Sequence, residues 1–201
     1  FTMAWRPEGE GLQSTIFFHC PGMPVTAKPL AETDLAIIPK NASWASASNM
    51  DMLAMYNGIL KLIGLVSPET HSEIVEAIGG IEERMKMKLG EDVLGSFGDT
   101  WILYDDPENG SLLFTGLTIV ADVKDAAKIE QALRALVGIL AEETNSDKEI
   151  TAREENYRGQ KITYMNFEGL PVPVSPAWTT YQGRLIVALF PQMVRVSLDR
   201  M

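Results

Sequence analysis

The sequence has few of the residues from which catalytic and metal sites are usually built. Its 201 residues include one cysteine, Cys20, and two histidines, His19 and His71. The single cysteine excludes an intrachain disulfide, and the three residues together cannot form a conventional structural zinc site without carboxylates. His19 and Cys20 are neighbours on an expected strand, so their side chains should point to opposite faces. This arrangement argues against a catalytic Cys–His pair.

Long hydrophobic runs and an excess of positive charge are also absent. The longest apolar stretches, such as residues 113–121 and 185–190, are far shorter than the roughly 20 residues of a membrane-spanning helix. The net charge is −10 at neutral pH. It argues against nucleic-acid binding, which needs a basic surface, and against electrostatic docking on anionic lipid. The apolar fraction of 46% and the charged fraction of 22% are typical of a soluble globular protein.

The sequence does not match common catalytic or cation-binding motifs. Residues 105–110 are the best cation candidate, but an EF-hand would need an oxygen ligand and a glutamate where the chain has Pro107 and Gly116. We therefore interpret 105–110 as a solvated hairpin turn. No GxSxG or GxGxxG motif occurs, and adjacent carboxylates point apart along a helix or strand. We expect no catalytic residue, no metal site and no cofactor.

The chain does contain an internal echo. Residues 48–51 and 122–125 each open a helical run, with Ser48 or Asp122 as the expected N-cap and a carboxylate three residues later. The apolar positions that follow match one for one and lie on one helix face: Met55, Ile59, Leu62, Ile63 and Val66 correspond to Ile129, Leu133, Leu136, Val137 and Leu140. The echo predicts two similar units in which Met55 and Ile129 face the same core layer.

The order of elements predicts an α+β fold: a mostly antiparallel sheet, covered on one face by helices, with two pseudo-repeated strand–helix–hairpin units. The expected strands are 1–6, 13–20, 43–48, 100–104, 112–123, 149–155, 161–167, 177–181 and 184–189, and the main helices are 49–64 and 124–143. We assign residues 1–40 to an N-terminal hairpin and connector of a preceding module. Residues 41–121 form the first unit. Residues 111–201 form the second, which shares the central strand and ends in a truncated helix.

Four stretches of the chain, residues 94–104, 117–125, 157–164 and 176–189, carry a resemblance to a known family. Together they resemble the DUF3352 family of uncharacterised bacterial proteins from planctomycetes and cyanobacteria. The likeness covers about residues 43–201 and implies a long exported or membrane-tethered protein built from such modules. It implies a location in the periplasm or cell envelope, with any anchor outside this chain, and it brings no established activity and no catalytic residues.

Two functions from different classes follow. The first is a non-enzymatic module of an exported envelope protein, with a structural or protein-interaction role and other protein subunits or envelope components as partners. The second is a carrier of lipid or another apolar ligand, with a groove between helices and sheet lined by Trp44, Met52, Met55 and Leu62. An enzyme whose site lies partly outside the chain is a third, and a cluster of buried carboxylates would support it.

Overall fold

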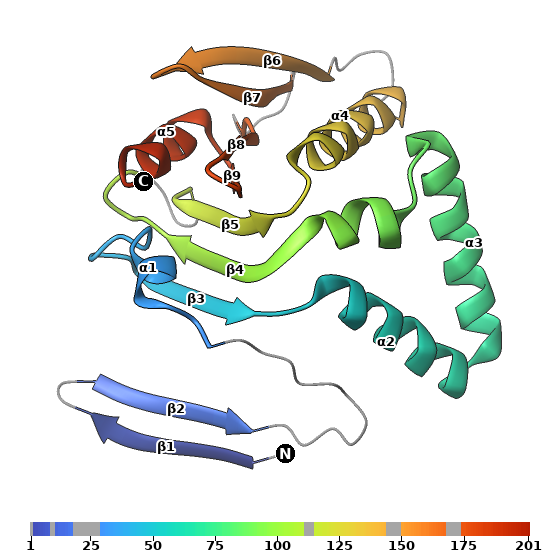
Figure 1. Cartoon of the computed structure of the whole chain (residues 1–201), viewed down its shortest axis with the longest axis horizontal. Coiled ribbons are helices and arrows are strands. Elements are labelled where there is room, and N and C mark those ends of the chain that lie inside the picture. Colours follow the sequence, from blue (N-terminus) through green and yellow to red (C-terminus); the bar gives the residue numbers. More distant parts are fainter. Residues whose placement is uncertain (1, 9–10, 18–28, 111–114, 144–149, 168–173) are drawn as a thin grey trace.

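The computed structural model describes residues 2–8, 11–17, 29–110, 115–143, 150–167 and 174–201, and of the side chains within 2–17 only that of Arg6. Its centre is a seven-stranded sheet in which every neighbouring pair is antiparallel (Figure 1). From one edge to the other the strands are β3 (Trp44–Asn49), β4 (Phe97–Asp105), β5 (Leu117–Val123), β9 (Arg184–Ala188), β8 (Ala177–Tyr181), β7 (Gln160–Phe167) and β6 (Ile150–Tyr157). Strands of both predicted units therefore join one sheet, with β5 pairing β4 on one side and β9 on the other.

The helices are mainly connections between strands. They are α1 (Glu32–Leu35), α2 (Met52–Val66), α3 (Pro68–Met85), α4 (Ala126–Glu143) and α5 (Pro191–Asp199), with a π-helical turn η1 (Leu89–Val93) and a 3-10 turn η2 (Leu94–Ser96) before β4. Ser67 caps α3, and Pro68 occupies its first position.

The expected caps of the two echoed helices are wrong by three residues. Asp51 Oδ1 accepts a hydrogen bond from the Ala54 amide at 2.9 Å, and Asp125 Oδ1 accepts one from the Lys128 amide at 3.1 Å, so the aspartate that ends each motif caps the helix. Ser48 and Asp122 still pair within strands, with Trp101 and Arg184 respectively. The backbone stays extended until it reaches the aspartate whose side chain can accept hydrogen bonds from the free amides at the start of the helix.

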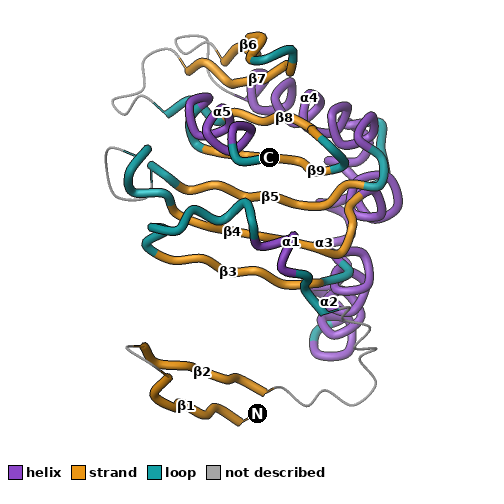
Figure 2. Tube along the Cα trace, turned by 60° about the vertical axis from the view of Figure 1, so that its left-hand side comes forward, coloured by secondary structure: helices purple, strands orange, loops and turns teal. Residues whose placement is uncertain are grey.

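Helices lie against both faces of the sheet. On one face, Ile129 and Val137 of α4 pack with Met165, Trp178 and Leu185 of β7, β8 and β9. On the other, Met193 and Val194 of α5, together with Ile37 just after α1, pack with Ile102, Tyr104, Val120, Ile162 and Ile186. Figure 2 shows α5 and α4 on opposite sides of the sheet. The predicted α+β class with an antiparallel sheet is confirmed. We expected helices on one face of the sheet, but they cover both faces. Leu185 and Ile186 are adjacent in β9, so their side chains point to opposite faces, and both are buried.

The pseudo-repeat is not confirmed. A strand leads into a capped helix at both places, but Ile129 is 1% exposed, whereas α2 has no fully buried residue. The main contacts of helix α2 are with α3, η1 and η2. Its inner side is marked by Leu53 and Tyr56, which lie against Gly90. Of the α2 residues that match the apolar face of α4, Met55 is half-buried, and Ile59, Leu62 and Val66 are exposed.

The N-terminal hairpin is confirmed. Strands β1 (Thr2–Glu8) and β2 (Gly11–Phe17) pair antiparallel and form a two-stranded sheet separate from the main one. The expected strand position of His19 and Cys20 lies outside the described residues.

Candidate functional site

The four residues predicted to line an apolar groove are spread over two elements. Trp44 begins β3 and is exposed, whereas α2 starts beyond the other end of that strand. On α2, Met52 and Met55 are half-buried and Leu62 is exposed. None of the four is among the residues that line three cavities in the described part of the chain. The structure thus leaves Trp44 apart from the three α2 residues.

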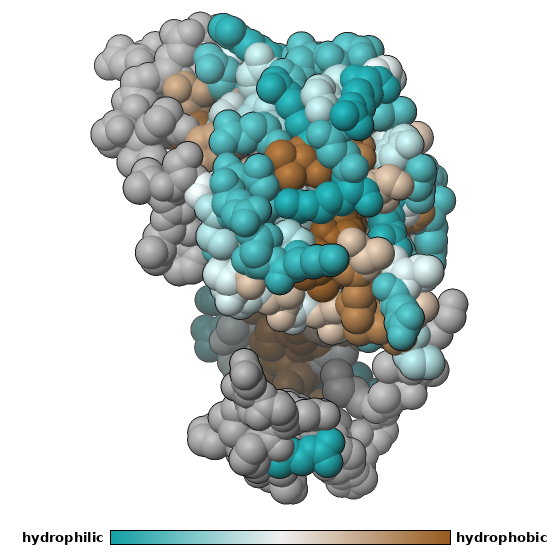
Figure 3. Space-filling model, turned by 90° about the vertical axis from the view of Figure 1, so that its left-hand side faces the viewer, coloured by the Kyte–Doolittle hydropathy of each residue, from teal (hydrophilic) through white to brown (hydrophobic). Residues whose placement is uncertain are grey.

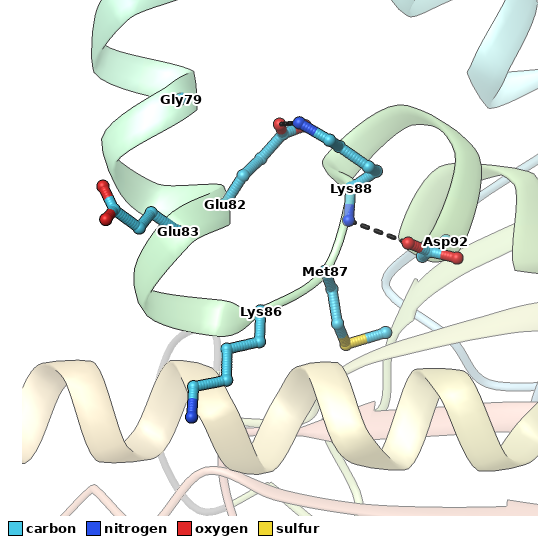
Figure 4. A pocket seen from close by; sticks show the side chains of 7 residues that line it. All are labelled: Gly79, Glu82, Glu83, Lys86, Met87, Lys88 and Asp92. Atoms are coloured by element: carbon cyan, nitrogen blue, oxygen red, sulfur yellow. Dashed lines mark hydrogen bonds and ion pairs between the residues drawn. The ribbon is translucent and has the colours of Figure 1, made fainter.

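The largest of these cavities, about 330 Å³, lies where α3 ends and η1 begins (Figure 4). Its lining consists of Gly79, Glu82, Glu83, Lys86, Met87, Lys88 and Asp92. The Glu82 carboxylate accepts hydrogen bonds from Lys88 Nζ and from the Leu89 amide, both at 2.8 Å. Asp92 accepts from the Lys88 amide at 2.9 Å and from Lys128 Nζ of α4 at 2.8 Å.

These contacts fix the charge states around the cavity. The hydrogen bond from Lys88 lowers the pKa of Glu82, and the hydrogen bond from Lys128 lowers the pKa of Asp92. The same bonds raise the pKa of Lys88 and of Lys128. At neutral pH both carboxylates are ionised and both amines are protonated. These ion pairs can connect α3, η1 and α4. An ionised carboxylate has no proton to donate and a protonated amine has no free electron pair, so these groups are poorly suited to act as general acids or as nucleophiles.

A second polar cluster surrounds the turn after β4. The prediction of a solvated turn at 105–110 holds for Pro107 and Glu108, which are exposed, but not for Asp106, which is 0% exposed. Its carboxylate accepts hydrogen bonds from Arg200 Nη2, from Asn109 Nδ2 at 2.9 Å and from the Asn109 amide at 3.3 Å. Arg200 lies just after α5, far away in sequence. The sequence near Asp106 therefore does not predict its ion pair with Arg200.

Burial and hydrogen bonding set the ionisation of this cluster. Burial acts to raise the pKa of Asp106, but the hydrogen bonds from Arg200 and Asn109 outweigh it, and the pKa is lowered overall. Tyr104 Oη lies 2.8 Å from Ser197 Oγ of α5, and burial raises the pKa of this phenol. The cluster is a charged pair beside a neutral phenol, and it joins the end of β4 to α5.

The other two cavities are also lined largely by polar or charged residues. One, of about 280 Å³, contains Thr33, Ala36, Ile37, Gln182, Arg184, Arg200 and Met201. Its arginines are neutralised, because Arg184 pairs with Asp34 at 3.0 Å and Asp122 at 3.2 Å, and Arg200 pairs with Asp106. The other, of about 290 Å³, lies between the start of α4 and strands β7 and β8. Across the described ranges, no three His, Cys, Asp or Glu side chains gather as they would around a metal ion.

The largest unexplained feature is apolar. Helix α2 contains one charged residue, Lys61, yet Leu65 is 76% and Val66 78% exposed. Other large exposed apolar residues lie on the same helix and on the two helices that follow it: Ile59 and Leu62 on α2, Val75 and Ile81 on α3, and Leu136 and Leu140 on α4. A helix that is apolar around most of its circumference is usually buried. Figure 3 shows the side of the molecule away from α2 and α3, which is mainly hydrophilic among its coloured residues.

Comparisons with known proteins give no further guide to the site. No family model matches the chain, and neither the curated proteins nor the solved structures include a match. Within the described part of the chain, none of the helices combines the length and the apolar character that a bilayer crossing needs.

Proposed function

We propose that the chain is a non-enzymatic protein-interaction module whose docking surface is the outer face of α2, defined by Ile59, Leu62, Leu65 and Val66. The observation that carries this proposal is the exposure of these four side chains on a helix with no fully buried residue. Leaving so much apolar surface in water costs free energy that a partner would recover by covering it. The partner fitted to this face is another protein subunit with an apolar surface of its own.

Electrostatics supports the same surface. The protein has a net charge of −10, but residues 42–67, which contain β3 and α2, carry only Asp51 and Lys61. Depletion of charge is typical of the centre of a protein–protein interface. An acidic partner would meet less electrostatic repulsion at residues 42–67 than at the rest of the protein surface. Placement of the module in a bacterial envelope is part of the proposal and rests on the DUF3352 resemblance alone.

The carrier of an apolar ligand is the second candidate, supported by the half-buried Met52 and Met55 of α2. The three described cavities favour it less, since each is lined largely by polar or charged residues. An apolar pocket is the usual feature of such a carrier.

Charge placed on the α2 face should remove the partner without unfolding the protein. We expect the double substitution Leu62→Glu and Val66→Glu to weaken partner binding at least about tenfold. The free energy of unfolding should change by less than about 1 kcal/mol, since the substituted side chains are exposed. Asn57→Glu adds the same kind of charge at an exposed polar position of the same helix and should leave binding unchanged.

Native mass spectrometry of the protein isolated from its source without denaturation provides the measurement. The proposal expects a bound protein subunit on the wild type and on Asn57→Glu, and its loss from the double variant. A co-purifying lipid or other small apolar molecule would instead favour the carrier. A bare wild-type chain would contradict both.

A further inference from the structure

The two edges of the main sheet differ in how well they are protected against pairing with another strand. Strand β6, at one edge, carries Arg153, Glu154 and Glu155 in succession. Charged side chains on an edge strand are a common protection against unwanted pairing. Strand β3, at the other edge, has the sequence WASASN, with no charge and no proline, and among the strands that the structure describes it pairs with β4 alone. The β3 edge is therefore chemically open to another strand.

The register shows which backbone groups of β3 face outward. The Met50 amide donates to the Asp99 carbonyl at 2.6 Å, and β3 pairs with β4 in an unbroken antiparallel register. Residues that bond to the partner strand alternate in such a ladder, so the backbone groups of Ser46 and Ser48 face β4. Those of Ala45 and Ala47 face away from it, toward the free edge.

We propose that the free edge of β3 is a strand-acceptor site, and that its occupant is the N-terminal hairpin β1–β2 of the same chain. A two-stranded hairpin alone is marginally stable in water, so β1–β2 gains stability by joining a sheet. In Figures 1 and 2 the hairpin lies on the free-edge side of β3, with β2 as its nearer strand. The proposal concerns backbone pairing at β3 and does not depend on the α2 docking surface.

Direction and tether length both permit this pairing. The arrows of β2 and β3 point the same way in Figure 1, so β2 would join as a parallel neighbour. Parallel strands need a crossover connection of a dozen or more residues. Residues 18–43, which include α1, supply that length. A tether of this kind holds the hairpin at an effective concentration in the millimolar range, well above that of a second copy in dilute solution.

Amide hydrogen exchange measured by NMR tests the proposal on the full chain. We expect the amides of Ala45 and Ala47 to exchange roughly 100-fold more slowly than in an unstructured peptide, at every protein concentration. Thr15→Pro, which interrupts β2, should return both amides to fast exchange, whereas Thr15→Val keeps a strand-forming residue there and should preserve protection. Slow exchange at Ile102 and Val120 in all variants would show that the main sheet is intact.

Three results would overturn the proposal. The first is fast exchange of Ala45 and Ala47 in the wild type, and the second is protection that survives Thr15→Pro. The third is protection that rises with protein concentration, which would assign the edge to a second copy of the chain.

Discussion

Replacing Asp106 by asparagine is expected to lower the free energy of unfolding by about 3 kcal/mol. Asp106 is fully buried, and the side chain of its partner Arg200 is only 22% exposed. The substitution removes the negative charge but leaves the guanidinium in place without its counterion. Removal of one member of a buried pair is costly for this reason, even where the intact pair adds little net stability.

Urea unfolding at neutral pH measures the effect of Asp106→Asn. Glu108→Gln, at an exposed position of the same turn, removes the same charge and should change the free energy of unfolding by less than about 0.5 kcal/mol. Equal stability of wild type and Asp106→Asn at neutral pH would contradict the assigned role of the pair.

The pH dependence gives an independent check of the same pair. The pKa of Asp106 is lowered in the folded protein, so its stabilising contribution is present above the unfolded-state pKa of about 3.9. The contribution is lost as the pH falls through the lower folded-state pKa. The stability difference between wild type and Asp106→Asn should therefore be constant near neutral pH and shrink in the acid range. A difference that grows on acidification would contradict the sign of the shift.

The sequence predicts local structure well where one apolar face is clear. Helix α4 and the hairpins β6–β7 and β8–β9 form close to where periodicity and turn residues place them. Helix α2 shows the limit of this reasoning, because apolar residues occupy both its inner side, at Leu53, and its outer side, at Leu62 and Val66. Periodicity predicts that a helix forms there, but it does not decide which side faces the core when both sides are apolar.

Charged contacts between distant segments are the part that sequence reasoning misses. The pairing of Asp106 with Arg200 and of Arg184 with Asp34 depends on how β4, β9, α1 and α5 assemble. An aspartate beside proline and glycine is equally typical of a solvated turn. The cavity at the end of α3 is missed for the same reason, because Lys128 reaches Asp92 from a different helix.

Gly116→Ala is the second substitution with a large expected effect. A Cβ added to Gly116 would lie 2.2 Å from the backbone oxygen of Asp106, far inside the contact distance. The two segments cannot simply move apart, because the Asp106 amide donates to the Gly116 carbonyl at 3.2 Å. Overpacking of this kind usually costs 1–3 kcal/mol, and contact with backbone rather than a flexible side chain places the expected loss near the upper end, at about 3 kcal/mol.

Gly138→Ala in α4 is the matched control for Gly116→Ala, since nothing lies within 4 Å of the Cβ it would add. Alanine in place of glycine inside a helix should raise the free energy of unfolding by about 0.5–1 kcal/mol. Glycine-to-alanine substitution should thus lower the free energy of unfolding at position 116 and raise it at position 138, as measured by urea unfolding.

Because Gly116 and Asp106 hold one turn together, the combined Gly116→Ala and Asp106→Asn variant should lose less stability than the sum of the two single changes. Strict additivity would show that the glycine contact and the Arg200 pair act independently, and a neutral Gly116→Ala would contradict the close approach of the two segments.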